Sequence, residues 1–333
     1  MIKRLEGPGG VIAWGRGYPG WVAFMDNDHV VLAWTVRPAA VALARPGAAA
    51  SAYELHSVVI SVRTARVIAA PVWPMHAPDS KVIATNDRGV VLMTGGDLVQ
   101  VSPELKVART LRLPDSQMDG WSTNASWSGD HVLLDGAAVG RFGPELWLDA
   151  RSLTIEHRWS WTSLGGYAVE DGDMLMWGAA DEPNGYYIRD LVSHWRPFPA
   201  ASIESREARF VGPGLVAYEL PPCCPASSFR LARIDGSAEA EIPGELHGWN
   251  LTPSPGSRSG SRYLFWENKG DQLRGLLIFD HGSLTPDYDV PLAGTLKGRM
   301  QWGAISPDGL HLAIANYKQV LIYSLPPIGP AGR

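Results

Sequence analysis

The stretch Arg299–Leu325, RMQWGAISPDGLHLAIANYKQVLIYSL, decides the fold. It predicts three short strands, at 304–305, His311–Ala315 and Val320–Leu325, because apolar residues alternate there with the period of two that is typical of a strand. The turn SPDG at 306–309 separates the first two strands, since proline presets φ and glycine accepts a positive φ. A three-stranded meander cannot bury both of its faces alone, so we expect further copies to pack on either side.

Weaker copies of this pattern recur along the chain. Each copy is anchored on the first residue of its first hairpin turn, and these residues are Asp26, Asn86, Ser128, Asp171, Gly212, Ser254 and Ser306. Their spacings are 60, 42, 43, 41, 42 and 52 residues. A period of roughly 40–50 residues is the length of one four-stranded blade. The sequence therefore predicts an all-β fold, a seven-bladed β-propeller with four-stranded antiparallel blades.

One domain over residues 1–333 is expected, because propellers run long as single domains. Its predicted blades span about 11–73, 80–114, 122–161, 165–200, 206–244, 247–293 and 299–325. The last blade has three strands, so we expect the N-terminal segment 1–6, with a strand at Ile2–Leu5, to complete it and hide an open edge. Longer connections, where function usually lies, are expected at 37–52, 114–123, 181–185, 221–227 and 253–262.

Composition narrows the class of protein. Apolar residues make up 45% of the chain, enough for a large core, and 36 glycines and 26 prolines fit many turns. The net charge is −5 and no basic run occurs, which argues against nucleic-acid and anionic-membrane partners. No apolar run is long enough for a transmembrane segment. Because no signal peptide is evident, a complete chain is expected to be cytoplasmic, and one whose leader was removed to be periplasmic or secreted.

Both cysteines are adjacent, at Cys223 and Cys224. Neighbouring Cα atoms are about 3.8 Å apart, which is shorter than a disulfide prefers. The favoured interpretation is a pair of loop thiols, and a redox or soft-metal role is the alternative.

The last repeat carries a resemblance to a known class of protein. The run ISPDG at 305–309, with Leu312-Ala313 and Val320–Tyr323, resembles the blades of bacterial propeller repeat proteins such as TolB-like and lactonase-like proteins. The run LWLDARSL at 146–153 is similar to the hinge of quinoprotein-type blades. Tryptophan–aspartate dipeptides, sialidase boxes and kelch glycine pairs are absent at blade spacing. The resemblance therefore implies the fold and no particular activity.

A candidate binding site follows from the expected innermost strands. In a propeller the first strand of each blade lines the central channel, and residues two apart share one face of a strand. The position five residues before each first turn forms a polar or aromatic set: Trp21, Lys81, Thr123, Gly166, Glu207, Trp249 and Gln301. We expect Trp21, Lys81, Thr123, Glu207, Trp249 and Gln301 to bind a ligand at the channel mouth. The alternative is that they are ordinary rim residues.

Signatures of catalysis are weak. The predicted mouth offers one carboxylate, Glu207, so neither a metal site nor a catalytic carboxylate pair is expected there. Nucleophile-elbow, Walker and zinc-protease motifs are absent, and no catalytic residue or cofactor is predicted. The favoured interpretation is a non-enzymatic binding or scaffold protein that holds a partner protein or small ligand at one face. The alternatives are a hydrolase or lyase with a site at the mouth, and a structural subunit of a larger assembly.

Overall fold

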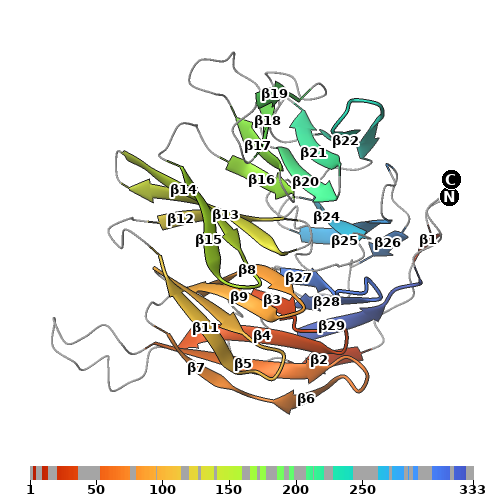
Figure 1. Cartoon of the computed structure of the whole chain (residues 1–333). Coiled ribbons are helices and arrows are strands. Elements are labelled where there is room, and N and C mark those ends of the chain that lie inside the picture. The colour runs from red at the N-terminus through yellow and green to blue at the C-terminus, as the bar shows by residue number, and fades with distance from the viewer. Residues whose placement is uncertain are drawn as a thin grey trace.

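The computed structural model describes residues 3–4, 10–13, 21–36, 53–75, 80–94, 96–113, 120–126, 129–138, 141–159, 166–170, 173–177, 186–190, 195–198, 208–212, 214–220, 228–242, 262–269, 272–280, 284, 288–291, 302–315 and 319–327. All secondary-structure elements within these ranges are β-strands (Figure 1). Among the same residues, no helix could cross a membrane.

The strands form seven sheets, which we number one to seven along the chain. Sheet one contains β3 (Trp21–Phe24), β4 (His29–Val36), β5 (Tyr53–Ser61) and β6 (Arg66–Ala69), with β7 (Val72–Met75) also paired to β5. Sheet two contains β8 (Ser80–Asn86), β9 (Gly89–Thr94), β10 (Asp97–Val101) and β11 (Val107–Arg112). Sheet three contains β12 (Gly120–Ala125), β13 (His131–Ala138), β14 (Arg141–Asp149) and β15 (Thr154–Trp159).

The remaining sheets follow the same order. Sheet four contains β16 (Gly166–Glu170), β17 (Asp173–Trp177), β18 (Tyr186–Asp190) and β19 (Trp195–Pro197). Sheet five contains β20 (Ala208–Gly212), β21 (Leu215–Leu220), β22 (Ser228–Arg233) and β23 (Glu239–Ile242). Sheet six contains β24 (Arg262–Lys269), β25 (Gln272–Asp280), β26 (Tyr288–Pro291) and β1 (Lys3–Arg4). Sheet seven contains β27 (Trp302–Ile305), β28 (His311–Ala315), β29 (Gln319–Ser324) and β2 (Gly10–Ala13).

The N-terminal segment does complete the last sheet, but not through the expected residues. The strand that pairs antiparallel with β29 is β2, with Val11 opposite Leu321 (Figure 1). The expected strand at Ile2–Leu5 is wrong for this position, because Lys3 and Arg4 pair in parallel with β26 of sheet six. The sequence GVIA of β2 is apolar and includes β-branched residues, so it favours a strand paired with β29 more than the charged pair Lys3-Arg4 does.

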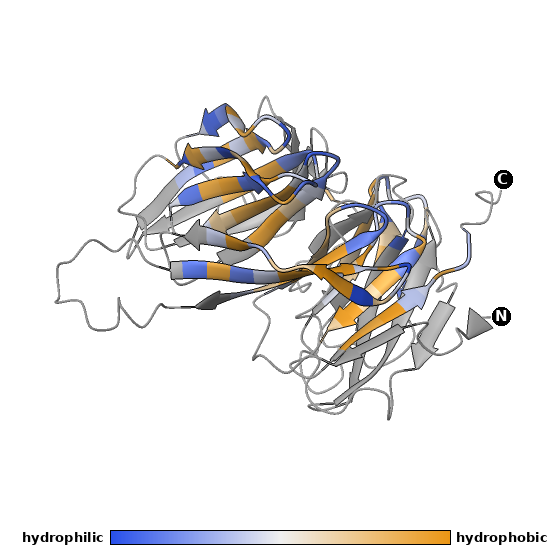
Figure 2. Cartoon of the chain, turned by 90° about the horizontal axis from the view of Figure 1, so that it is seen from below, coloured by the Kyte–Doolittle hydropathy of each residue, from blue (hydrophilic) through white to orange (hydrophobic). Residues whose placement is uncertain are grey.

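The hydrophobic core lies between neighbouring sheets. In β9, Val90 and Leu92 pack into the cluster shared with sheet one, whereas Val91 and Met93 pack into the cluster shared with sheet three. A third cluster joins sheet one to sheet seven. Both faces of these strands are therefore buried, and each fully buried aliphatic side chain contributes about 1.5–3 kcal/mol. Figure 2 shows hydrophobic residues along the strands inside the molecule and hydrophilic residues at connecting turns.

The SPDG turn of sheet seven has a close copy in sheet three. Ser306 N donates to His311 O at 2.9 Å, Gly309 N donates to Ser306 O at 2.8 Å, and His311 N donates to Ser306 Oγ at 2.9 Å. Ser126, Gly129 and His131 make the same three bonds, and both glycines have φ 72°. The true counterpart of Ser306 is therefore Ser126 rather than Ser128. This two-residue shift places the turn directly after Ala125, where β12 (Gly120–Ala125) ends.

A second bond recurs at the same end of four sheets. The N–H that follows the third strand donates to a carbonyl of the first hairpin turn, in the pairs Val62 to Asp28, Ala150 to Asp130, Ile234 to Gly214 and Leu325 to Leu310, at 2.8, 2.7, 2.9 and 2.7 Å. The first hairpin turn and the turn after the third strand are thus held side by side. We call the end of the sheets that carries these turns the turn face.

Candidate binding site

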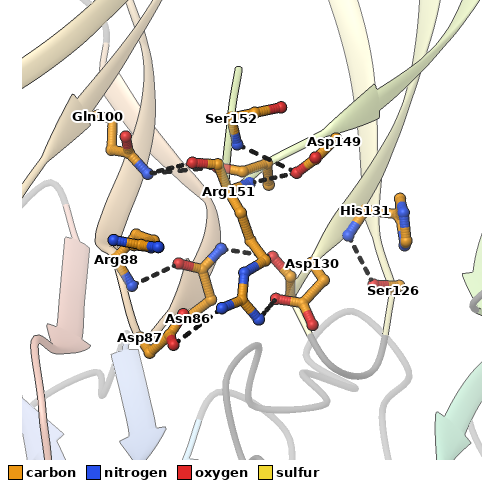
Figure 3. Close-up of polar contacts among 12 residues, drawn as sticks. Asn86, Asp87, Arg88, Gln100, Ser126, Asp130, His131, Asp149, Arg151 and Ser152 are labelled. Atoms are coloured by element: carbon orange, nitrogen blue, oxygen red, sulfur yellow. Dashed lines mark hydrogen bonds and ion pairs between the residues drawn. The ribbon is translucent and has the colours of Figure 1, made fainter. Parts of the chain in front are cut away.

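Side chains of sheet two reach backbone carbonyls of sheet three at the turn face (Figure 3). Asn86, which is buried, donates from Nδ2 to Gly129 O at 3.1 Å. Gln100, also buried, donates from Nε2 to Ala150 O and Arg151 O at 3.4 Å each. These bonds give the buried amides of Asn86 and Gln100 hydrogen-bond partners at the junction between the two sheets. They hold the turns of the two sheets in a fixed relation.

Arg151 crosses the same junction in the opposite direction. Its guanidinium lies 3.0 Å from Asp87 Oδ2 in sheet two and 3.6 Å from Asp130 Oδ1 in its own sheet. The turn that carries Arg151 is closed by Asp149 Oδ1, which accepts from Arg151 N at 2.7 Å and Ser152 N at 3.1 Å. Burial raises the pKa of the Asp149 carboxyl, but hydrogen bonds from the Ser152 side chain and from the backbone N–H groups of Ser152 and Arg151 outweigh burial and leave the pKa below its ordinary value of 3.8.

Beside these contacts lies a solvent-accessible cavity of about 480 Å³. Its lining comes from the two turns of sheet two, the outer strand β11 and the turn after β14: Asp87, Arg88, Gln100, Ser102, Pro103, Glu104, Ala108, Arg109, Arg151 and Ser152. The volume falls within the range of small-ligand sites, about 300–1,000 Å³. The lining is mostly polar, so the cavity suits a polar group better than an apolar one.

The arginine residues of this lining differ in the partners that they already bind. Arg151 is paired with carboxylates, whereas Arg109 donates from Nη1 to the carbonyl of Ser152 at 2.8 Å. A hydrogen bond from the Ser102 side chain lowers the pKa of Glu104, so Glu104 is negatively charged at neutral pH. With Asp87, the cavity therefore carries three guanidinium groups and two carboxylates.

Trp21 and Lys81, two residues of the predicted channel mouth, lie near the starts of β3 and β8, at the ends of those strands away from the first hairpin turn, whereas Thr123 lies nearer the turn end of β12. Trp21, Lys81 and Thr123 belong to β3, β8 and β12, while Glu207, Trp249 and Gln301 lie outside the described residues. Trp21 is 5% exposed and belongs to the core cluster of sheets one and two. Its indole nitrogen has no hydrogen-bond partner among the described residues. Ligand binding at the mouth stays a prediction, and Cys223 and Cys224 also lie outside the described residues.

The cavity could not be predicted from the sequence, because its lining residues come from segments that are separate in the chain. Arg88, Gln100, Arg109 and Arg151 come from four separate segments, and nothing local shows that these segments meet. One usable signal was present: SWSGDH at 126–131 and SPDGLH at 306–311 share the spacing Ser-x-x-Gly-x-His. Among the residues that the structure describes, no group of three or more histidine, cysteine, aspartate or glutamate side chains is placed to hold a metal ion.

Comparison with known proteins places the fold. No protein-family model and no curated protein matches the chain. Among solved structures, the WD40 domain of Pan2 from Neurospora crassa matches with TM-score 0.60 and 10% identity, covering 97% of each chain. A chain of the Mitotic Checkpoint Complex matches with TM-score 0.54 and 14% identity over 98% of this chain and 94% of that one. The C-terminal WD40 domain of Sif2 matches with TM-score 0.52 and 12% identity over 98% and 99%. The chain therefore has a β-propeller fold similar to that of WD40 domains.

Proposed function

We propose that the chain is a closed seven-bladed propeller that serves as a non-enzymatic binding platform, with its partner bound at the turn face. The observation that carries this proposal is the polar cavity between sheets two and three, whose walls are fixed by Asn86, Gln100 and Arg151. A site on rigid strands and short turns needs little ordering when a partner binds. One structure of the same fold belongs to a checkpoint complex, so the fold is compatible with a role in an assembly.

Contacts between other sheets support the closed ring. Asn27 Oδ1 in sheet one accepts from Asp308 N in sheet seven at 2.9 Å. Trp73 Nε1 in sheet one donates to Leu105 O in sheet two at 3.1 Å. Arg262 in sheet six donates to Gly309 O and Pro326 O in sheet seven at 2.6 Å each. Sheet seven, the last in the chain, thus contacts both sheet one and sheet six, as a closed ring requires.

Site-specific photo-crosslinking tests the location of the partner. A photoreactive amino acid would be placed at Glu104 on the turn face or at Thr110 on the outer strand β11, both exposed. In extracts of the cells that make the protein, we expect a discrete crosslinked species from position 104 and none from position 110. Equal crosslinking at both positions, or none at position 104, would contradict binding at the turn face.

A thermal melt separates this proposal from a metal-dependent hydrolase or lyase. A ligand present at 100 times its Kd stabilises the native state by about 2.7 kcal/mol, which a melt detects. We expect the melting temperature to be unchanged by EDTA, Ca²⁺ or Zn²⁺. A melting temperature that falls with EDTA and returns with a metal would favour the enzyme.

A further inference from the structure

The cavity of the turn face holds two guanidinium groups, of Arg88 and Arg109, that form no ion pair with a carboxylate among the described residues. Arg88 is exposed, and its side chain makes no ion pair among the residues that the structure describes, since its recorded bond is from the backbone N–H to Asn86 Oδ1 at 2.9 Å. Arg109 uses one N–H on the Ser152 carbonyl. A guanidinium has five N–H donors, so most of the donors of both groups remain for a ligand.

The other lining residues limit what that ligand can be. Asp87 and Glu104 add negative charge to the same cavity, and Asp87 is already paired with Arg151. The three guanidinium groups and two carboxylates of the lining leave one net positive charge, which a singly charged group balances and a doubly charged group exceeds. Pro103 and Ala108 supply apolar surface that a short aliphatic stem can cover. This combination fits a carboxylate on a flexible side chain.

We propose that Arg88 and Arg109 bind the carboxylate of a glutamate or aspartate in an extended acidic segment of a partner protein. This assignment rests on the proposed function and gives the chemistry of the partner at the turn face. Arginine suits the task because its planar fork matches a carboxylate with two parallel hydrogen bonds. The cavity is open to solvent, so the segment runs across the turns while one acidic side chain enters between sheets two and three.

Fluorescence anisotropy with defined peptides tests the proposal directly. The probe is a labelled octapeptide of alternating glycine and glutamate, and the matched control replaces glutamate by glutamine. We expect the glutamate peptide to bind and the glutamine peptide to bind at least about tenfold more weakly, because a hydrogen bond to a charged group is lost at each contact. We also expect binding to weaken between about 50 mM and about 500 mM salt, since the contact is partly exposed.

Variants locate the binding. Arg88→Ala and Arg109→Ala should each weaken binding of the glutamate peptide about tenfold, whereas Arg66→Ala, which removes an exposed arginine from β6 of sheet one, should change it less than about twofold. Circular dichroism melts of all three variants check that the fold is retained. Failure of the glutamate peptide to bind, or equal losses for Arg66→Ala and Arg88→Ala, would overturn the proposal.

A phosphoserine octapeptide provides the last arm of the test. Tighter binding of that peptide than of the glutamate peptide would replace the carboxylate by a phosphate and overturn the assignment. The crosslinking experiment remains independent of these results. Crosslinking at position 104 without peptide binding would leave the binding platform standing and reject the acidic segment. Peptide binding without crosslinking at position 104 would contradict a partner protein at the turn face and would show only that the cavity accepts a carboxylate.

Discussion

Two junctions, between sheets two and three and between sheets six and seven, are held by hydrogen bonds from side chains to backbone carbonyls. The donor residues differ between the two. In the first, Asn86 donates to Gly129 O, and Gln100 donates to the carbonyls of Ala150 and Arg151. In the second, the single side chain of Arg262 reaches both Gly309 O and Pro326 O. The acceptors are equivalent, because Gly129 and Gly309 occupy the same turn position.

This comparison explains why the repeats are weak in sequence. A carbonyl acceptor is a backbone atom, so the fold fixes its place whatever side chain its residue carries. The donor is a side chain, and any group long enough with an N–H can supply the bond. Donors can therefore differ from junction to junction while the acceptors repeat. The first junction also borders the cavity of the turn face.

Substitution of Arg262 should give the largest effect. Arg262 is fully buried, so Arg262→Ala leaves two carbonyls without donors and an empty space between sheets six and seven. We expect the free energy of unfolding to fall by about 3–5 kcal/mol, measured by urea titration. Arg262→Lys keeps the charge but not the fork, and an intermediate loss is expected. A loss for Arg262→Ala below about 1 kcal/mol would show that one side chain does not hold this junction.

Gly89 lies in a crowded turn, whereas Gly214 lies in an open one. A Cβ added at Gly89, which has φ 111°, would lie 2.0 Å from Val101 O. A Cβ at Gly214, with φ 64°, would have Ile234 Cγ2 at 3.8 Å as its nearest neighbour. We expect Gly89→Ala to cost about 3 kcal/mol or more and Gly214→Ala about 1 kcal/mol, the cost of a left-handed alanine alone. Equal losses in urea titrations would mean that the turn at Gly89 can shift away.

Asn86→Ala should weaken the first junction less than Arg262→Ala weakens the second. The substitution removes one neutral donor, while Gln100 and Arg151 still connect sheets two and three. We expect a loss of about 1–2 kcal/mol, because the buried Gly129 carbonyl is left unpaired. A double substitution with Gln100→Ala tests the shared role. A combined loss equal to the sum of the two single losses would show that the two donors act independently.

The smallest expected effect concerns pH and the turn that carries Arg151. The pKa of Asp149 is below 3.8 in the folded protein, so its charge stabilises the fold above the pKa of the unfolded chain. That contribution is lost as the pH falls through the lower folded pKa. Asp149→Asn can still accept the same two hydrogen bonds, so we expect it to cost about 0.5 kcal/mol at pH 7 and progressively less below about pH 4. A difference that grew on acidification would contradict this sign.

Local signals in the sequence determined the strands and their repeat. Residues 311–315 alternate as expected and form β28, and the turn at 306–309 closes through Ser306 and Gly309 as its residues predict. These features depend on neighbours within about six residues, where side-chain periodicity and turn chemistry dominate. Copies of the meander pack on either side of a sheet, as expected, and β9 is buried on both faces between sheets one and three.

Tertiary structure alone decided how distant segments meet. Sheet seven is completed by β2 and not by β1. This choice depends on register with β29, about 310 residues away. The cavity depended on side chains from four segments arriving at one place, which no local pattern encodes. The physical reason is that many side chains can satisfy a given backbone carbonyl. Sequence therefore predicts that a bond is needed, whereas packing of the sheets selects the residue that makes it.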